Sequence, residues 1–407
     1  SNGRELQVLG WHLLRTRWGL DRAFGIEPAV LRRWLAFVEA AYNAPLYHNA
    51  THAADVLQTA HFMLASGGAR PLLDDLAVLA LLLAAIVHDV GHDGFTNSFH
   101  KHRVTQRALT YNDQSIQENY HLWLLFDRMA AQPELNIFRS LPAAQFLELR
   151  RRLILLVLST DMSRHFGLLQ DVRQALGTAG MKERDVGMAW PAEAVDPLLC
   201  FLLHACDVAN QARPHEFAVA WATRIFAELF HQGDSERELG LPLSPLCDRS
   251  TTIISSAELG FIRFILRPTC DILTELLPSA AEVCVPELER NFVHWMLRED
   301  STVRLKDRHT RPASSHRSST GSNGSWASLL CCAQSCGKTD SVTSAQFCGG
   351  TATESSKGGF GSAGSLRQSL RTRRRASYAD AETTAYLRTA STDSEILAKE
   401  RRLSELD

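Results

Sequence analysis

The sequence predicts an all-α protein, and three observations support this. Between about Gly3 and Glu299, large apolar residues recur at three- and four-residue spacing, which is typical of amphipathic helices. Alternating strand patterns and Asn-Gly hairpin turns are nearly absent from this region. Prolines separate the successive helical runs, namely Pro133, Pro142, Pro191 and Pro278. We therefore expect one compact multi-helix domain over residues 1–300.

Four segments carry the helical pattern most clearly. Three are amphipathic and cover residues 30–42, 146–159 and 217–230. The fourth, Leu76–Val87, is apolar on every side and is too short for a bilayer, which requires about 20 residues. We expect it to be a buried core helix, and we expect no transmembrane segment.

The character of the sequence changes after about Ser301. Ser, Thr and Gly dominate, and few large apolar side chains are present to compensate for the entropy lost on ordering. We therefore expect residues 301–407 to form a mostly disordered C-terminal tail.

Composition excludes several classes of protein. Hydrophobic residues make up 45% of the chain and charged residues 22%, as in ordinary soluble proteins. The formal net charge of −2 gives no reason to expect nucleic acid or an anionic membrane as a partner. Nine scattered cysteines and an N-terminus without a signal-peptide pattern favour an intracellular, cytoplasmic protein. A dimer is compatible with the sequence.

Histidines and carboxylates recur inside the apolar segments. In "YHNATHAAD", His48, His52 and Asp55 are spaced four and three apart, so we expect them to share one helical face. We expect Asp55 to orient a neighbouring histidine by a hydrogen bond. Further groups follow along the chain: His88, Asp89, His92 and Asn97; Glu118 and His121; Thr160, Asp161 and His165; His204, Asp207 and Asn210.

This recurrence favours a metal site. A lone buried histidine is more often a packed core residue than a ligand, and an unpartnered buried polar group costs about 1–3 kcal/mol. A divalent cation would offset that cost for many groups at once, because it binds neutral imidazoles and carboxylates. Two histidines and two aspartates from three helices, with room for water, are typical of a catalytic metal site: His52, His88, Asp89 and Asp207. We therefore expect a metal-centred pocket.

Five blocks of the sequence resemble a known family. The blocks "YHNATHAADVLQ", "HDVGHDGFTNSF", "YNDQSIQENYHL" and "STDMSRHF", and the block that begins "HACDVANQ", resemble the successive signatures of the class I cyclic nucleotide phosphodiesterases. The resemblance covers roughly Leu6 to Met296. It implies an HD-type metal phosphohydrolase domain that hydrolyses cAMP, cGMP or both to the 5′-monophosphates and so terminates cyclic nucleotide signalling.

The resemblance also implies roles for individual residues. His52, His88, Asp89 and Asp207 would bind zinc. Asp89 would bridge to a second ion, Mg²⁺ or Mn²⁺. The waters of that ion would be held by His92, Glu118 and Thr160. A hydroxide shared by the metals would attack phosphorus, and His48 would protonate the leaving 3′ oxygen as general acid. The residues around the base would be Asn210, Ile225, Glu258 and Phe261.

Two positions depart from the family pattern. Glu258 stands where the family has a glutamine that contacts the purine. An ionised glutamate only accepts hydrogen bonds and would favour guanine, whose N1–H and amino group are adjacent donors. A glutamate that turns outward, or that is protonated and mimics glutamine, would not favour guanine, so the base preference stays open. Gln211 replaces the usual proline after Asn210.

The tail carries two further motifs. "RTRRRAS" and "KERRLSEL" present Ser377 and Ser404 in the Arg-Arg-x-Ser pattern that basophilic protein kinases prefer. The alternative is a solvated basic stretch without a partner. The cysteines of "LLCCAQSC" suit palmitoylation, although clustered free thiols are the simpler interpretation.

Two other functions compete with the leading one. Another helical His-Asp phosphohydrolase acting on linear nucleotides would share the metal ligands, but neither the His48 block nor "HQGDSERELG". A catalytically weak nucleotide-binding regulator would have lost a metal ligand or the general acid, and every one of these residues is present.

Overall fold

The computed structural model of the chain describes residues 3–178 and 190–309. All described elements belong to one compact unit. Residues 310–407 lie outside the described residues, and they include Ser377, Ser404 and the clustered cysteines of the expected tail.

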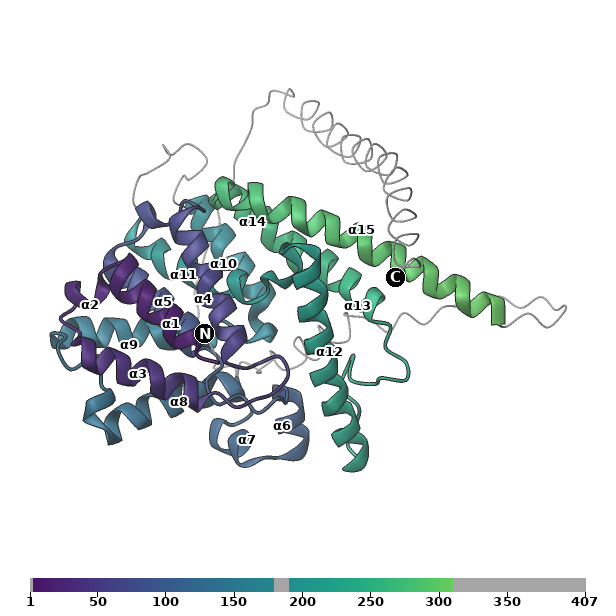
Figure 1. Ribbon diagram of the computed structural model, residues 1–407, viewed down its shortest axis with the longest axis horizontal. Coiled ribbons are helices and arrows are strands. Elements are labelled where there is room, and N and C mark those ends of the chain that lie inside the picture. Colours follow the sequence, from purple (N-terminus) through teal and green to yellow (C-terminus); the bar gives the residue numbers. More distant parts are fainter. Residues whose placement is uncertain (1–2, 179–189, 310–407) are drawn as a thin grey trace, which may run out of the picture. The chain divides into compact units, whose positions relative to one another are not determined.

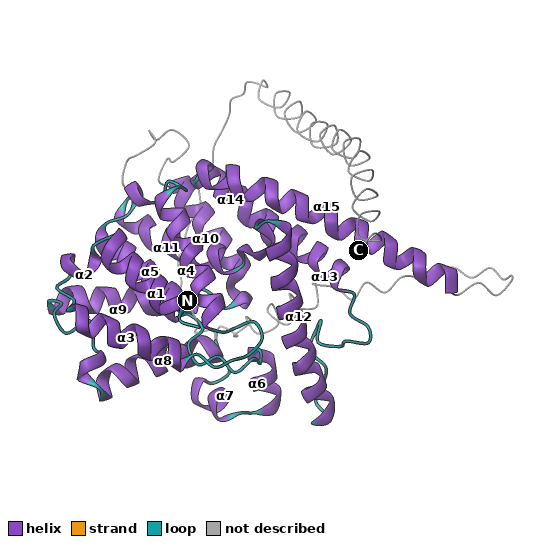
Figure 2. Ribbon diagram, viewed as in Figure 1, coloured by secondary structure: helices purple, strands orange, loops and turns teal. Residues whose placement is uncertain are grey.

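Regular structure in the two described ranges is entirely helical, which confirms the predicted all-α class (Figure 2). The α-helices are α1 (Glu5–Trp11), α2 (Leu20–Ala23), α3 (Pro28–Ala41), α4 (Ala50–Ala65), α5 (Asp75–Val87), α6 (Asn97–Arg103), α7 (Gln106–Tyr111), α8 (Ile116–Ala131), α9 (Ala143–Leu158), α10 (His165–Thr178), α11 (Ala192–Asp207), α12 (His215–Glu238), α13 (Ile254–Phe261), α14 (Arg267–Leu276) and α15 (Pro278–His309). Short 3₁₀ turns are η2 (Arg70–Leu72), η3 (Pro133–Leu135), η4 (Met162–Arg164) and η6 (Ala209–Ala212), and π-helical turns are η1 (His12–Arg17) and η7 (Ile262–Leu266).

Helix α5 forms the centre of the core, as its sequence predicts. The side chains from Ala77 to Val87 are all buried, because α5 packs against α4, α9 and α11 (Figure 1). The helix begins where the Asp74 carboxylate accepts a hydrogen bond of 2.7 Å from the N–H of Ala77. Because α5 is buried, its C-terminal end places the next residues, His88 and Asp89, in the protein interior. No helix in the described ranges is long and apolar enough to cross a membrane.

The three predicted amphipathic helices correspond to α3, α9 and α12. The four prolines lie at helix boundaries, since Pro142 and Pro191 directly precede α9 and α11, and Pro133 and Pro278 are the first residues of η3 and α15. Helix α15 continues to His309, past the boundary expected at residue 300. The division into a domain and a tail therefore stays a prediction.

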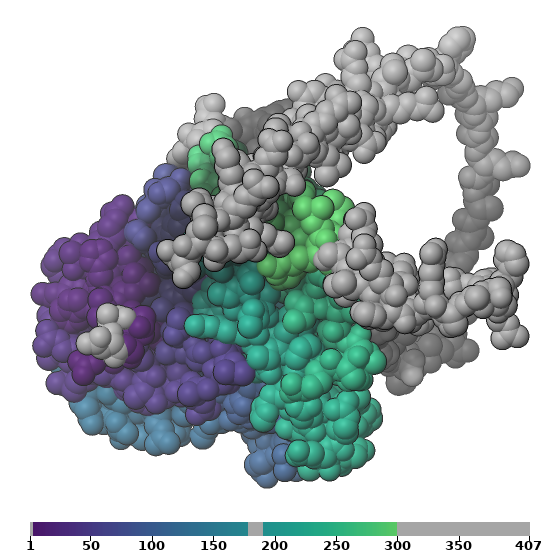
Figure 3. Space-filling model, turned by 45° about the vertical axis from the view of Figure 1, so that its right-hand side comes forward, coloured from purple at the N-terminus to yellow at the C-terminus, as the bar shows by residue number. Residues whose placement is uncertain are grey.

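A second apolar cluster joins the later helices. Val208, Leu259, Ile262 and Trp295 belong to it, and they connect the η6 region and α13 with α15. Helix α12 packs against η6, α13 and α15. The space-filling view shows this part of the unit, in teal to green, beside the N-terminal helices in purple (Figure 3). Helices far apart in the sequence thus pack together, as α4 does with α11 and α12 does with α15.

Candidate active site

The first site residues lie where α4 begins. The Asn49 side chain accepts hydrogen bonds from the N–H groups of Thr51 (2.9 Å) and His52 (3.3 Å) and so caps the helix. His52 is therefore in the first turn, while His48 precedes the helix. The prediction that both lie on one helical face is wrong for His48, because the asparagine cap sets the start of α4 at Ala50.

The next two predicted ligands follow the central helix. The ring of His88 donates a hydrogen bond through Nδ1 to the carbonyl of Ala85, at 3.0 Å. This contact turns Nε2, which is buried and has no hydrogen-bond partner in the described structure, toward Asp89 and Asp207. A buried lone pair held in this way is suited to metal binding. Asp207 is the last residue of α11 and approaches from the other side.

The side chains of the four predicted metal ligands, His52, His88, Asp89 and Asp207, converge on one point. Oδ1 of Asp207 lies 3.0 Å from Nε2 of His52 and 3.4 Å from Nε2 of His88. Oδ2 of Asp89 lies 3.6 Å and 3.2 Å from the same two nitrogens. The structure thus brings together all four predicted ligands from α4, the end of α5 and the end of α11.

The spacing of these atoms fits a divalent cation. Ligand bonds of about 2.0–2.2 Å in tetrahedral to octahedral geometry require ligand atoms about 2.8–3.6 Å apart. The four measured separations fall within that range. Three of the residues, His52, His88 and Asp207, also form a group whose ligand atoms all lie within 4.8 Å of one another. Without a cation, two buried carboxylates and two imidazoles would meet here with few other partners.

A second layer of histidines surrounds the cluster. His121 donates through Nδ1 to the carbonyl of Val90 (2.8 Å), and its Nε2 lies 3.8 Å from Oδ1 of Asp89. The ring of His92 stacks on the rings of His48 and His121, at centroid distances of 4.2 and 5.7 Å. Burial lowers the pKa of His121 to about 4 and lowers that of His92, so both imidazoles are neutral.

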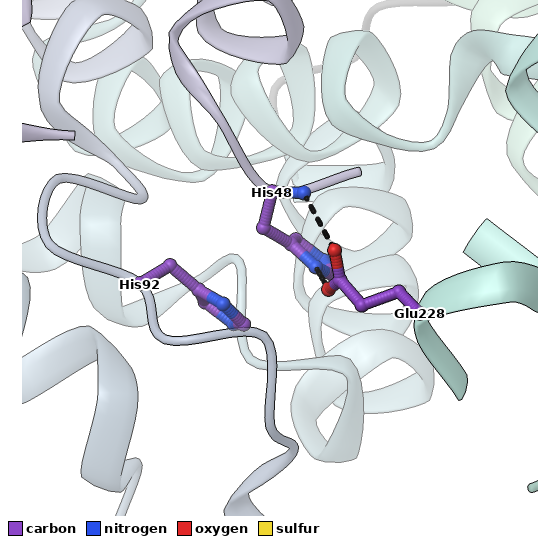
Figure 4. Close-up of side chains that lie close together, drawn as sticks. All are labelled: His48, His92 and Glu228. Atoms are coloured by element: carbon purple, nitrogen blue, oxygen red, sulfur yellow. Dashed lines mark hydrogen bonds and ion pairs between the residues drawn. The ribbon is translucent and has the colours of Figure 1, made fainter. Parts of the chain in front are cut away.

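The most informative contact at the site is an ion pair (Figure 4). Nδ1 of His48 lies 2.5 Å from Oε1 of Glu228, and Oε2 of Glu228 accepts from the backbone N–H of Tyr47 at 2.7 Å. Burial opposes the charged imidazolium, but the charge and hydrogen bond of Glu228 outweigh it and raise the pKa of His48 to about 9. Sequence reasoning missed Glu228 because its only local signal is its place in an amphipathic helix.

Glu118 and Thr160, which we expected to hold metal-bound water, form hydrogen bonds with residues other than the four predicted ligands. Glu118 accepts a hydrogen bond of 2.9 Å from the Asn97 side-chain amide, and burial, reinforced by the charge of Asp161, raises its pKa to about 8. The Thr160 hydroxyl donates to the carbonyl of Val157 at 2.8 Å. Among the described residues, neither side chain hydrogen-bonds to a predicted ligand.

The predicted base-contacting residues divide into two pairs. Asn210 donates to the hydroxyl of Tyr47, whose ring centroid lies 4.6 Å from that of His52. Ile225 is half-buried on α12, three residues before Glu228. Asn210 is therefore linked to the metal cluster through Tyr47.

The second pair lies on α13, which packs against α12 and α15. Glu258 is only 5% exposed, and its Oε2 has no hydrogen-bond partner in the described structure. The alternative in which Glu258 turns outward is therefore wrong. Burial raises the pKa of Glu258 to about 8. Phe261 is half-buried and packs against the apolar cluster that holds Ile262 and Trp295.

Other polar residues of the predicted motifs have different partners. Asp55 forms an ion pair of 2.8 Å with Arg213, so the expectation that it orients a histidine is wrong. From α4, the Asp55 side chain instead contacts Arg213, which directly follows η6. His165 and His204 form a buried pair, Nδ1 to Nε2, at 2.8 Å.

Known proteins are similar to this chain in sequence and in fold. The family model for 3′5′-cyclic nucleotide phosphodiesterases matches residues 47–288. A human dual specificity calcium/calmodulin-dependent 3′,5′-cyclic nucleotide phosphodiesterase 1B is 37% identical over 291 residues, 70% of this chain and 52% of that protein. A 3′,5′-cyclic-AMP phosphodiesterase 4C from Rattus norvegicus is 36% identical over 292 residues, covering 72% and 54% of the two chains. This chain thus spans about half the length of the curated relatives it matches.

A solved structure of a phosphodiesterase domain has a similar fold. The phosphodiesterase domain of the RhoPDE fusion protein from the choanoflagellate Salpingoeca rosetta superposes with a TM-score of 0.67 and 28% identity. The match covers 74% of this chain and 92% of that domain. Sequence, fold and the family model therefore agree with the resemblance seen in the sequence blocks. The chain belongs to the 3′5′-cyclic nucleotide phosphodiesterase family.

Proposed function

We propose that this chain hydrolyses 3′,5′-cyclic nucleotides, cAMP, cGMP or both, to the 5′-monophosphates and thereby terminates cyclic nucleotide signalling. One observation carries the proposal: two histidines and two aspartates converge beside the His48–Glu228 pair, with ligand atoms 3.0–3.6 Å apart. Family membership supports the same reaction class.

The same four residues, His52, His88, Asp89 and Asp207, would hold a tightly bound Zn²⁺, with Mg²⁺ or Mn²⁺ in a neighbouring second site. Asp89 suits a bridging role because its Oδ2 faces His52 and His88, whereas its Oδ1 faces His121. The metal pair, when bound, supplies an activated water as nucleophile and positive charge for the phosphate.

Three further residues would position water at the second metal. His92 is buried against the cluster, and Glu118 lies close enough for the charge of Asp89 to act on it. Thr160 is buried after α9. In this proposal each of the three side chains holds a water by a hydrogen bond and does not bind the metal directly. This role agrees with their positions beside, but not among, the four converging ligands.

His48 would act as the general acid. Its Nδ1 is engaged by Glu228, so Nε2 is the nitrogen left to give a proton to the departing 3′ oxygen of the ribose. Its ring stacks on His92 and lies at a centroid distance of 5.9 Å from that of His52. His48 is thus adjacent to the metal cluster, while Glu228 keeps it out of the ligand set.

The purine would lie between Asn210 and Ile225 on one side and α13, with Glu258 and Phe261, on the other. A buried, protonated Glu258 offers one donor and one acceptor, as glutamine does, and so suits either purine. Once ionised it offers acceptors alone, which favour guanine over adenine. We therefore infer that the chain accepts both cyclic nucleotides near neutral pH.

We further propose a cytoplasmic enzyme whose tail is a kinase substrate. Ser377 and Ser404 follow paired arginines, and a phosphate there would lie beside several positive charges. Mass spectrometry of the protein from cells with raised cyclic nucleotide levels tests this. Phosphate at either serine supports it, and unmodified peptides at both sites contradict it.

Product analysis tests the reaction. Purified protein with Mg²⁺ or Mn²⁺ is incubated with cAMP, cGMP and a linear nucleoside 5′-monophosphate, and products are separated by chromatography. Formation of 5′-AMP or 5′-GMP from the cyclic substrates is the expected result. Hydrolysis of the linear nucleotide alone would instead assign the chain to the other His-Asp phosphohydrolases.

A further inference from the structure

One buried side chain next to the proposed base site is used by none of the roles above. Gln211 directly follows Asn210 in η6, is 1% exposed, and connects three separate parts of the fold. Its Oε1 accepts a hydrogen bond of 2.8 Å from the indole Nε1 of Trp295, and its Nε2 donates to the carbonyl of Ala218 at 3.4 Å. The Asn291 side chain donates to the Gln211 backbone carbonyl at 2.9 Å.

Trp295 extends this connection to the opposite wall of the base site. It is 3% exposed and belongs to the apolar cluster that contains Leu259 and Ile262, the neighbours of Glu258 and Phe261 in the chain. Helix α15, which carries Trp295 and Asn291, packs against both η6 and α13. The same helix therefore contacts both η6, which carries Asn210, and α13, which carries Glu258 and Phe261.

The other side of η6 connects to the catalytic groups. Asn210 donates through Nδ2 to the hydroxyl of Tyr47, which leaves its Oδ1 to accept a hydrogen bond. The Tyr47 ring lies at centroid distances of 4.7 Å from His48 and 4.6 Å from His52. A displacement of η6 would consequently move Asn210 relative to the phosphate-binding centre.

From these contacts, and building on the proposed function, we propose that Gln211 is a positioning residue for the nucleotide base. Through Trp295 it fixes Asn210 at the distance from the Phe261 wall that a purine requires. A proline at position 211 would have no side-chain acceptor for the indole N–H and no donor for the Ala218 carbonyl, so both contacts depend on the glutamine side chain.

Two variants remove the key hydrogen bond from its opposite ends. Gln211→Met keeps the length of the side chain but removes its acceptor, and Trp295→Phe removes the donor. Trp34→Phe is the matched control, because Trp34 is equally buried and its Nε1 has no hydrogen-bond partner among the described residues. KM and kcat are measured for cAMP and cGMP, and kcat/KM for bis(4-nitrophenyl) phosphate, a phosphodiester without a purine.

We expect Gln211→Met and Trp295→Phe each to raise KM for the cyclic nucleotides about threefold to tenfold, the usual effect of one lost hydrogen bond. The double variant should add little to either single change, since both remove the same contact. Turnover of bis(4-nitrophenyl) phosphate should stay at the wild-type level, and Trp34→Phe should alter neither substrate.

Other outcomes overturn the proposal. An unchanged nucleotide KM in both variants, or an equal fall in activity toward all substrates, would reduce Gln211 to an ordinary packing residue. Failure of the proposed function has a different signature, because the wild-type protein itself would then hydrolyse neither cyclic nucleotide.

Discussion

Nδ1 of His48 lies 2.5 Å from Oε1 of Glu228, although the two residues are 180 positions apart in the chain. The α12 carboxylate thus holds the side chain that we propose as general acid. Glu228 also accepts hydrogen bonds from the backbone N–H groups of Tyr47 and His48, so it fixes the whole segment before α4.

Replacing this carboxylate should impair proton donation. The charge of Glu228 helps to raise the pKa of His48 to about 9, and a raised pKa keeps the acid protonated below that pH. Glu228→Gln should therefore lower kcat roughly 10- to 100-fold and move the alkaline limb of the kcat–pH profile to lower pH.

Glu236→Gln provides the control for that experiment. Glu236 is also a buried carboxylate of α12, but it accepts hydrogen bonds from Ser244 and Gln232. This variant should lose stability without moving the pH profile. An alkaline limb in Glu228→Gln that coincides with that of the wild type would contradict the role of Glu228.

The two helix caps allow stability to be separated from catalysis. Asn49 caps α4 between His48 and His52, and Asp74 caps α5 at the end far from His88. Each alanine substitution should cost about 1 kcal/mol of unfolding free energy by denaturant titration. Only Asn49→Ala should also lower kcat, because its cap sets the relative positions of the two histidines. Equal kcat values in both variants would show that the cap does not position the site.

Glu258 should make stability depend on pH. Its carboxyl has an ordinary pKa of 4.5 when unfolded and about 8 when buried in the native state. The native state thus binds more protons between these values, so the unfolding free energy falls as pH rises and the loss ends near pH 8. Between pH 7 and pH 9 the fall from this group should be roughly 1 kcal/mol. Chemical denaturation of Glu258→Gln should lack this component, and equal slopes for both proteins would argue against a buried, protonated Glu258.

The same residue should make base preference depend on pH. We expect the ratio of kcat/KM for cGMP to that for cAMP to rise between pH 7 and pH 9 as Glu258 ionises. In Glu258→Gln the ratio should stay constant, and at pH 9 the variant should favour cAMP more than the wild type does. Steady-state kinetics with both nucleotides measure this, and a wild-type ratio that does not vary with pH would exclude Glu258 from contact with the base.

Much of the fold follows from local sequence patterns. The uniformly apolar run before His88 predicts the buried helix α5, and the prolines at 142 and 191 mark the starts of α9 and α11. The start of α4 was harder to predict, because the helical spacing of His48 and His52 continues across the asparagine cap. Spacing alone does not reveal where an N-cap interrupts a helix.

The candidate site, like the fold, could be predicted only in part from local sequence patterns. The four convergent residues were predictable because histidines and aspartates at the ends of apolar helices are unusual and recur. The His48–Glu228 and Gln211–Trp295 contacts were not predictable, because the residues that they join lie 180 and 84 positions apart in the chain. The pairing of Asp55 with Arg213 was not predictable either, because Arg213 lies on another segment and the contact depends on tertiary packing.

In the proposed enzyme, Asp207 and its three neighbours bind the metal on which turnover depends. We expect wild-type protein to carry zinc by elemental analysis and to hydrolyse cyclic nucleotide when Mg²⁺ or Mn²⁺ is supplied. Asp207→Ala should lose both the zinc and nearly all turnover. Asp196→Ala, on the same helix and paired with Arg151 at the surface, should keep both. Full turnover together with wild-type zinc content in a folded Asp207→Ala variant would contradict the assignment of Asp207 as a metal ligand.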